Sequence, residues 1–186
     1  MSGGADHSTG NSLEHHPGRL QNSGIILGMF HEGPIDGVIF RPLKPYGDQR
    51  GWLIELVRED ELPGEHRPVM TYLSMTLPGV VRGPHEHRRQ ADLFAFVGPG
   101  DFKLYLWDAR RDSPTYGNRQ IAVVGQSNRR AVLVPPGVVH AYRNTSDVPG
   151  LVLNAPNRLY AGWGRNEPVD EIRYENLADT PYRLEE

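Results

Sequence analysis

The chain has 186 residues, of which 23% are charged and 38% are hydrophobic, and its formal net charge is -3. This length suits one domain with a sizeable core, and the small net charge gives no bulk electrostatic reason to expect a nucleic-acid or membrane partner. The sequence contains no cysteine, so disulfides and thiolate chemistry are excluded and any metal must bind nitrogen and oxygen ligands.

The N-terminal residues 1–23 are rich in Ser, Gly, Asn and His and lack apolar periodicity, which is typical of a flexible tail. They contain no basic segment followed by an apolar core, so we expect no secretory signal. No apolar run in the chain reaches the roughly 18 residues that span a bilayer. We therefore expect residues 24–186 to form a single domain in the cytoplasm.

From residue 35 onward, short apolar or alternating segments are separated by clusters of Gly, Pro, Asp and Asn. Regularly spaced short strands with turn signals indicate a β-sandwich or β-barrel. Helical periodicity is missing apart from a possible turn near residues 58–62, and the polar residues 166–186 are expected to form a short helix and a tail. The expected strands lie in residues 35–43, 51–57, 69–77, 92–97, 101–109, 120–125, 131–136, 138–144 and 150–156.

The segment with the clearest chemistry contains His85 and His87, two positions apart. Residues i and i+2 of a strand point to the same face, so both imidazoles can enter the barrel together. Asp92 follows His87 at a spacing with the wrong parity for one continuous strand. We expect the intervening RRQA to turn the chain, so that Asp92 opens the next strand on the inner face and Phe94 and Phe96 follow it inside.

A second segment, VLVPPGVVHAYRN, places His140 on a new strand after a tight turn at Pro135 and Gly137, with Tyr142 on the same face. Three imidazoles and one carboxylate with open positions suit one divalent ion, Fe(II), Mn(II), Ni(II) or Zn(II). The alternative is a metal-free barrel in which these histidines form hydrogen bonds or perform acid–base work.

These two segments resemble the two motifs of the cupin superfamily, and the resemblance implies an all-β cupin fold, a jelly-roll-like double-stranded β-barrel. The first motif matches at Gly79, His85, His87, Asp92 and Gly98, with Asp in place of the usual Glu. The second matches at Pro135, Gly137, His140 and Asn144, with Arg129 where a Gly is expected.

A wider resemblance, over roughly residues 35–180, is to the dTDP-4-dehydrorhamnose 3,5-epimerase family, itself a cupin barrel. The stretches GDQRGWLIEL, GVVRGPH, LWDARRDSPTYG, VPPGVVHAY and RLYAGWGRNEPVDEIRYEN carry it, in the family's order. The resemblance implies a homodimeric enzyme of deoxysugar biosynthesis. In that family a His removes a proton next to the keto group of a nucleotide-linked sugar, a Tyr supplies one to the other face, an Asp orients the His, a Lys stabilises the enolate and Arg residues grip the diphosphate.

Residue by residue, His85 matches the family's base and Tyr160 the second tyrosine of its C-terminal pair. Arg82 matches an arginine that contacts the nucleotide, and we expect it to be buried and to need an anionic partner. Arg50 and Glu55 match the family's Arg-Gly…Glu strand. They are expected to bind substrate or, alternatively, to pair with each other at a dimer edge.

Other positions depart from the family. Asp92 stands at the Lys position and His87 at a Gln position, and together these two changes restore a metal site that the epimerases lack. Three further departures follow. Asn154 stands in place of the proton-donating Tyr, and Asn176 in place of the His-orienting Asp. Met70 and Tyr72 stand in place of the Gln and Asn that recognise the nucleobase.

A His85 bound to metal has no free lone pair for base work, so the base would be another group, with Tyr72, Tyr142 or Glu86 as candidates. Tyr72, Tyr142 and Tyr160 are otherwise expected to be half-buried residues of the substrate-binding wall. Three functions remain open at this point. They are a metal-assisted epimerase of a nucleotide-linked or phosphorylated keto sugar, a metal-dependent cupin of another class such as an Fe(II) dioxygenase, and a non-catalytic sugar- or metal-binding cupin.

Overall fold

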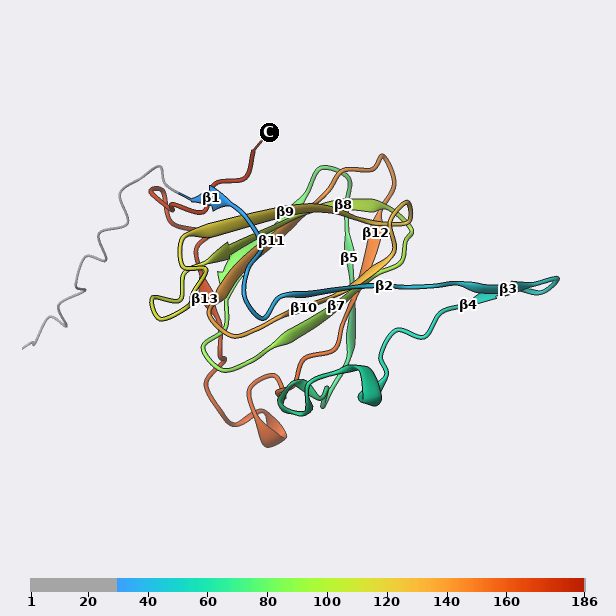
Figure 1. Cartoon of the computed structure of the whole chain (residues 1–186), viewed down its shortest axis with the longest axis horizontal. Coiled ribbons are helices and arrows are strands. Elements are labelled where there is room, and N and C mark those ends of the chain that lie inside the picture. Colours follow the sequence, from blue (N-terminus) through green and yellow to red (C-terminus); the bar gives the residue numbers. More distant parts are fainter. Residues whose placement is uncertain (1–29, 186) are drawn as a thin grey trace, which may run out of the picture.

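A computed structural model describes residues 30–185, so the expected tail at residues 1–23 lies outside the described part of the chain. Two β-sheets face each other and enclose the core of a barrel (Figure 1). Between residues 30 and 185 the helical segments are three 3-10 turns, at Glu59–Glu61, Gly64–His66 and Trp163–Arg165. The predicted all-β, jelly-roll-like fold is confirmed. Within the described residues, no helix has the length and apolar character needed to cross a membrane.

Antiparallel pairing dominates both sheets, and the exception is the parallel pair β1–β9. The six-stranded sheet has the order β1 (His31–Glu32), β9 (Asn118–Gly125), β8 (Asp101–Asp108), β11 (Val138–Asn144), β6 (Val81–Glu86) and β13 (Ile172–Arg173). The five-stranded sheet has the order β2 (Ile39–Pro42), β10 (Arg130–Val134), β7 (Asp92–Phe96), β12 (Gly150–Asn154) and β5 (Tyr72–Thr76). A separate hairpin, β3 (Tyr46–Asp48) and β4 (Gly51–Leu53), projects from the barrel (Figure 1).

Each of the nine segments expected to form strands overlaps a strand of the structure, and the expected turn near residues 58–62 contains a 3-10 helix. The prediction of a short helix within residues 166–186 is wrong. That segment instead adds the two-residue strand β13 to the edge of β6 and then packs Tyr182, which is 5% exposed, against the outer side of the six-stranded sheet. The aromatic side chains of this segment pack on an apolar face of the sheet, and this tertiary contact determines the conformation of the segment.

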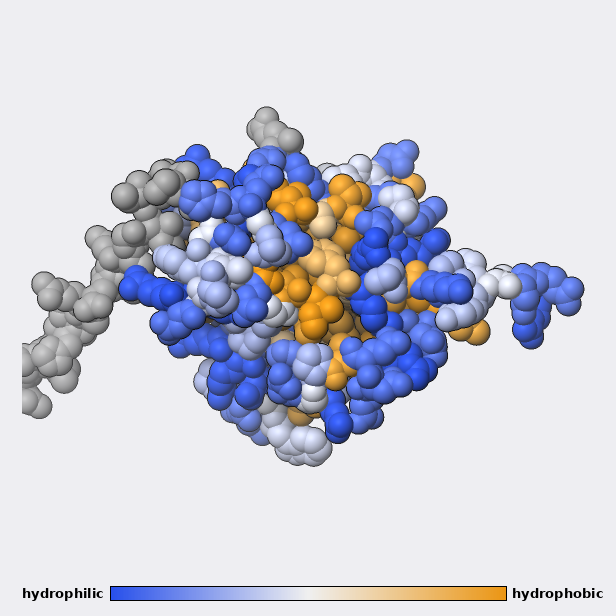
Figure 2. Space-filling view, in the orientation of Figure 1, coloured by the Kyte–Doolittle hydropathy of each residue, from blue (hydrophilic) through white to orange (hydrophobic). Residues whose placement is uncertain are grey.

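Alternation along the strands builds the core. On β7, Phe94 and Phe96 point between the two sheets as expected, while Leu93 and Ala95 point to the outer side of their sheet. Trp107 is 1% exposed and therefore core as expected, although it belongs to the outer cluster under the C-terminal segment. In the space-filling view, apolar residues gather in the middle of the face and hydrophilic ones surround them (Figure 2).

The buried Asp108, at the end of β8, organises the turn that follows it. Its carboxylate accepts hydrogen bonds from Arg110 Nε at 2.8 Å, Ser113 Oγ at 2.6 Å and Thr115 Oγ1 at 2.6 Å. Burial by itself raises the pKa of Asp108, but these donors outweigh it and lower the pKa to about 2. The SPTYG stretch therefore works as a turn around a buried carboxylate.

Candidate metal centre

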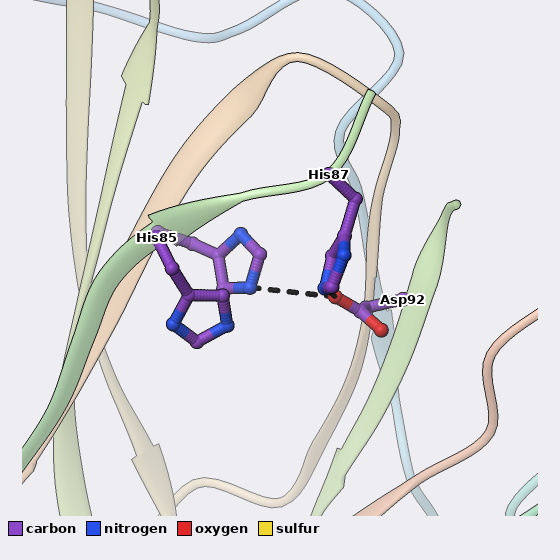
Figure 3. A group of neighbouring side chains, drawn as sticks. His85, His87 and Asp92 are labelled. Atoms are coloured by element: carbon purple, nitrogen blue, oxygen red, sulfur yellow. Dashed lines mark ion pairs between the residues drawn. The ribbon is translucent and has the colours of Figure 1, made fainter. Parts of the chain in front are cut away.

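Four side chains from three strands and one turn meet at the inner side of the barrel. His85 lies on β6, His87 directly after it and Asp92 at the start of β7 (Figure 3). His140 lies on β11. One ligand atom of each residue lies within 4.8 Å of the others. His85 and His140 are direct partners across the β6–β11 pair. The expected convergence is thus present in the structure, and the role of these residues as ligands stays a prediction.

Gly83 lets β6 approach β11 closely enough to form this cluster. Its φ of 83° lies in the left-handed region, where a side chain is disfavoured. A Cβ atom at this position would stand 2.5 Å from the carbonyl oxygen of His140. The glycine in the GPHEH stretch is therefore required by the contact between the two histidine-bearing strands.

The backbone fixes which nitrogen of two histidines faces the cluster. His140 Nδ1 lies 3.1 Å from the carbonyl oxygen of Val138, and His87 Nδ1 contacts the carbonyl oxygen of Asp170. Carbonyl oxygens only accept, so each Nδ1 is the protonated nitrogen and each Nε2 presents a lone pair to the interior. Metal-binding histidines are usually held in this way.

Those lone pairs point at a carboxylate. Asp92 Oδ2 lies 3.2 Å from His87 Nε2 and 3.4 Å from His140 Nε2, and the geometry at buried His140 Nε2 makes no hydrogen bond. Asp92 Oδ1 accepts from the side-chain amides of Gln90 at 2.9 Å and Asn154 at 2.8 Å. Gln90 Nε2 also lies 3.2 Å from His87 Nε2. With the imidazoles neutral, their Nε2 atoms and Asp92 Oδ2 form a donor set that fits a divalent ion.

The pKa shifts of His85 and His87 are consistent with a positive charge between these side chains. Burial lowers the pKa of His85 to about 2, helped by the neighbouring His140 and His87, so its imidazole is neutral. Burial would also lower the pKa of His87, but the carboxylate of Asp92 outweighs it and raises the pKa to about 8. In this geometry a proton on His87 occupies the place that a metal ion would take.

Asp170 holds the turn between the two parts of the cluster, a role for which the sequence shows no periodic or spacing signal. Its carboxylate accepts hydrogen bonds from the backbone N–H groups of Arg88, Arg89 and Gln90 at 3.2, 2.9 and 3.0 Å. Since its carbonyl oxygen also contacts His87, one residue of the C-terminal segment fixes both the turn and an imidazole. Asn176 does not take the place of the His-orienting acid. The carboxylate next to His85 is that of Glu171, whose Oε1 lies 3.9 Å from His85 Nε2.

The cluster lies at one side of a cavity of about 1130 Å³. Three tyrosines line the cavity as expected, but to different depths: Tyr142 is 5% exposed, Tyr72 47% and Tyr160 54%. Arg82 also lines the cavity, yet it is exposed, and its guanidinium donates to Thr76 Oγ1 at 2.9 Å and to the carbonyl oxygen of Met75 at 2.7 Å. The expectation that Arg82 is buried is wrong, because it lies at the open side of the barrel.

Three expected functional residues lie elsewhere. Arg50 sits on the β3–β4 hairpin and pairs with Asp48, and Glu55 pairs with Arg58, so Arg50 and Glu55 neither contact each other nor line the cavity. Glu86, one of the candidate bases, points away from the cluster and accepts a hydrogen bond from the hydroxyl of Tyr174. Alternation on β6 explains this, because Glu86 stands between two inward-facing histidines.

A cavity in the mouth of an all-β barrel, lined by His85, His87 and the carboxylate of Glu171, is typical of enzymes that act on small molecules. A family model described as dTDP-4-dehydrorhamnose 3,5-epimerase matches residues 32–161. The chain belongs to this family, and the predicted enzyme class, a sugar epimerase, is confirmed.

Individual relatives agree with the family. The probable low-salt glycan biosynthesis epimerase Agl13 of Haloferax volcanii is 39% identical over 127 residues, which cover 68% of this chain and 81% of the relative. The spore coat polysaccharide biosynthesis protein SpsL of Bacillus subtilis is 38% identical over 62% of this chain and 75% of its own length. A crystal structure of a dTDP sugar isomerase from Desulfovibrio desulfuricans superposes with a TM-score of 0.68 at 25% identity, covering 81% of this chain and 91% of that one.

Proposed function

We propose that the chain epimerises a keto sugar carried on a nucleotide or a phosphate, with one divalent ion held by His85, His87, Asp92 and His140. The observation that supports metal binding is the position of Asp92 Oδ2 next to the Nε2 atoms of two imidazoles. Backbone carbonyls fix the tautomers of these two rings. The family supplies the reaction class.

Epimerisation next to a keto group begins with removal of a carbon-bound proton and leaves an enolate. A bound divalent ion would supply positive charge to steady the enolate oxygen. With His85 engaged as a ligand, the base we propose is the carboxylate of Glu171, which lines the cavity next to His85. Without an ion, neutral His85 has the lone pair for the same task.

The exposed guanidinium of Arg82 is the residue we propose for the phosphate. Its described partners, Thr76 and Met75, are neutral, so its charge remains available to an anion in the cavity. Hydrogen bonds to charged groups contribute roughly 1.5–3 kcal/mol. We expect Arg82→Ala to weaken binding of a nucleotide sugar about tenfold or more, measured by calorimetry with Arg111→Ala as an arginine control outside this cavity. Equal affinities of wild type and Arg82→Ala would contradict this role.

We also propose a homodimer. The projecting hairpin exposes Trp52 and Leu53, at 58% and 61%, and the edge strand β5 exposes Leu73 and Met75, at 62% and 57%. An unpaired apolar edge strand is a liability for a monomer, and a second copy would cover it. Arg50 could then reach a substrate only in the partner's cavity. Light scattering tests the dimer, and a monomeric wild type at micromolar concentration would contradict it.

The experiment that tests the metal part combines metal analysis of the purified protein with deuterium exchange from solvent into keto sugars. We expect close to one divalent ion per chain and exchange that stops after chelation and returns with the ion. If exchange runs at the same rate with the metal verified absent, His85 acts as a free base and the metal part of the proposal is wrong. The sugar part fails if nucleotide-linked and phosphorylated keto sugars all exchange nothing.

A further inference from the structure

Among the three tyrosines of the cavity, Tyr72 is the one whose hydroxyl is joined to the histidine–aspartate cluster. It lies on the inner face of β5 together with Ser74 and Thr76, directly opposite Asn154 of β12. Asn154 Nδ2 donates to Tyr72 Oη at 2.8 Å and to Asp92 Oδ1 at 2.8 Å. A single amide nitrogen therefore links the phenol to the predicted metal ligand.

The chemistry of the amide sets the direction of these hydrogen bonds. Asp92 can only accept, so the nitrogen of Asn154 must face it; the reversed amide would press an oxygen against the carboxylate. Both amide hydrogens are then used, one on Asp92 and one on Tyr72, and the phenol oxygen is an acceptor. Among residues 30–185, no described hydrogen bond uses the phenol proton of Tyr72, which is free to point into the cavity.

The other two tyrosines lack this arrangement. The hydroxyl of Tyr142 lies 3.2 Å from Ser74 Oγ, and the side chain is almost fully buried. Tyr160 stands at the exposed side of the cavity, and its backbone N–H contacts the sulfur of Met70. Burial also raises the pKa of Tyr72 to about 12, so the phenol keeps its proton at neutral pH.

We infer that Tyr72 is the acid of the epimerisation, positioned by Asn154, and that it delivers its hydroxyl proton to the enolate carbon. This inference rests on the proposed function. The base takes the proton of the substrate's C–H bond, and the electron pair of that bond forms the enolate. The enolate carbon then takes the proton of Tyr72, which breaks the O–H bond and leaves a phenolate. The protonated base returns its proton through water to the phenolate, so no net proton is gained or lost.

Because the base and the acid are different residues, loss of the acid alone should give a result that loss of substrate binding would not produce. Without an acid on the second face, the base can still remove the proton, exchange it with solvent and return deuterium to the same face. Tyr72→Phe should therefore keep incorporating deuterium into unchanged substrate while losing the epimerised product. A tyrosine that only holds the substrate would lower both rates together.

The test follows both rates by NMR in deuterium oxide, with intact protein at high concentration and dTDP-4-keto-6-deoxyglucose as the probe. For Tyr72→Phe we expect epimer formation to fall about 100-fold or more and deuterium exchange to stay within about threefold of wild type. Tyr116→Phe removes a hydroxyl from a tyrosine of similar exposure outside this cavity and should change neither rate.

Parallel loss of both rates, or undiminished epimer formation, in Tyr72→Phe would overturn the assignment. So would the same uncoupling in Tyr160→Phe, which would identify Tyr160 as the acid. A wild type that exchanges no deuterium with this probe would overturn the nucleotide-linked form of the proposed function and the role of Tyr72 with it, whereas an active wild type confines any failure to Tyr72.

Discussion

Two buried aspartates at strand ends show that the same side chain can either hold a turn together or belong to a predicted ligand site. Asp108, at the end of β8, is surrounded by donors from Arg110, Ser113 and Thr115. Asp92, at the start of β7, has donors on Oδ1, while its Oδ2 faces two imidazoles whose lone pairs point toward it. A carboxylate surrounded by donors stabilises the fold, whereas the donor set around Asp92 fits a positive charge, either a proton on His87 or a divalent ion.

The largest effect we expect is on metal binding. Asp92→Asn keeps the shape of the side chain but replaces a charged oxygen with a neutral amide, so divalent-ion affinity should fall at least about 100-fold. The melting temperature of the metal-free protein should change little, because an amide can donate to the imidazole nitrogens. Metal analysis and calorimetry measure the loss. Asp108→Asn is the matched control, and it should retain the ion.

Removing the other carboxylate should act on stability instead. Asp108→Ala leaves the partly buried Arg110 and two hydroxyl groups without their acceptor, which we expect to lower the free energy of unfolding by about 3 kcal/mol. Urea titration of the metal-free protein measures it. The comparison fails if Asp92→Asn destabilises the metal-free protein as strongly as this variant does.

The pH dependence of stability should sharpen the contrast further. The pKa of Asp108 is lowered from its ordinary value of 3.8 to about 2. A carboxyl group with a lowered folded-state pKa contributes stability above about pH 4, and this contribution disappears as the pH falls through about 2. We expect a loss on the order of 1–2 kcal/mol over that interval, allowing for solvent screening. Unfolding curves of wild type and Asp108→Asn should converge at low pH, and parallel curves would contradict this account.

The smallest effect concerns one donor. Ser113→Ala removes a single hydroxyl from Asp108 and leaves Arg110 and Thr115 in place, so we expect a loss of about 1 kcal/mol. Thr115→Val tests the other hydroxyl at similar size and should agree within about a factor of two. Values near 3 kcal/mol for either variant would mean that the donors act as one cooperative unit.

The positions of the four predicted ligands follow from local rules. His85 and His87 share a face through strand alternation, and a polar turn resets the parity so that Asp92 points inward. His140 follows a Pro-Gly turn onto the strand that pairs with β6. These are short-range signals, and they are readable in a single sequence.

The residues that surround the cluster could not be predicted from short-range sequence signals. Asp170 and Glu171 arrive from about 80 residues away in a segment without strand periodicity, and only tertiary contact places them. The role of Arg50 was expected from family resemblance, but the hairpin carries it away from its own cavity. Sequence spacing cannot reveal where a projecting hairpin ends in space.

The double contact of Asp170, with the turn after His87 and with the ring of His87 itself, also bears on the order of events during synthesis. All four predicted ligands leave the ribosome before this residue does. The barrel strands can therefore pair while the turn that separates His87 from Asp92 still lacks its anchor. We therefore expect the cluster to reach its final geometry, and to bind an ion if the proposed site is correct, only after the segment that carries Asp170 has docked.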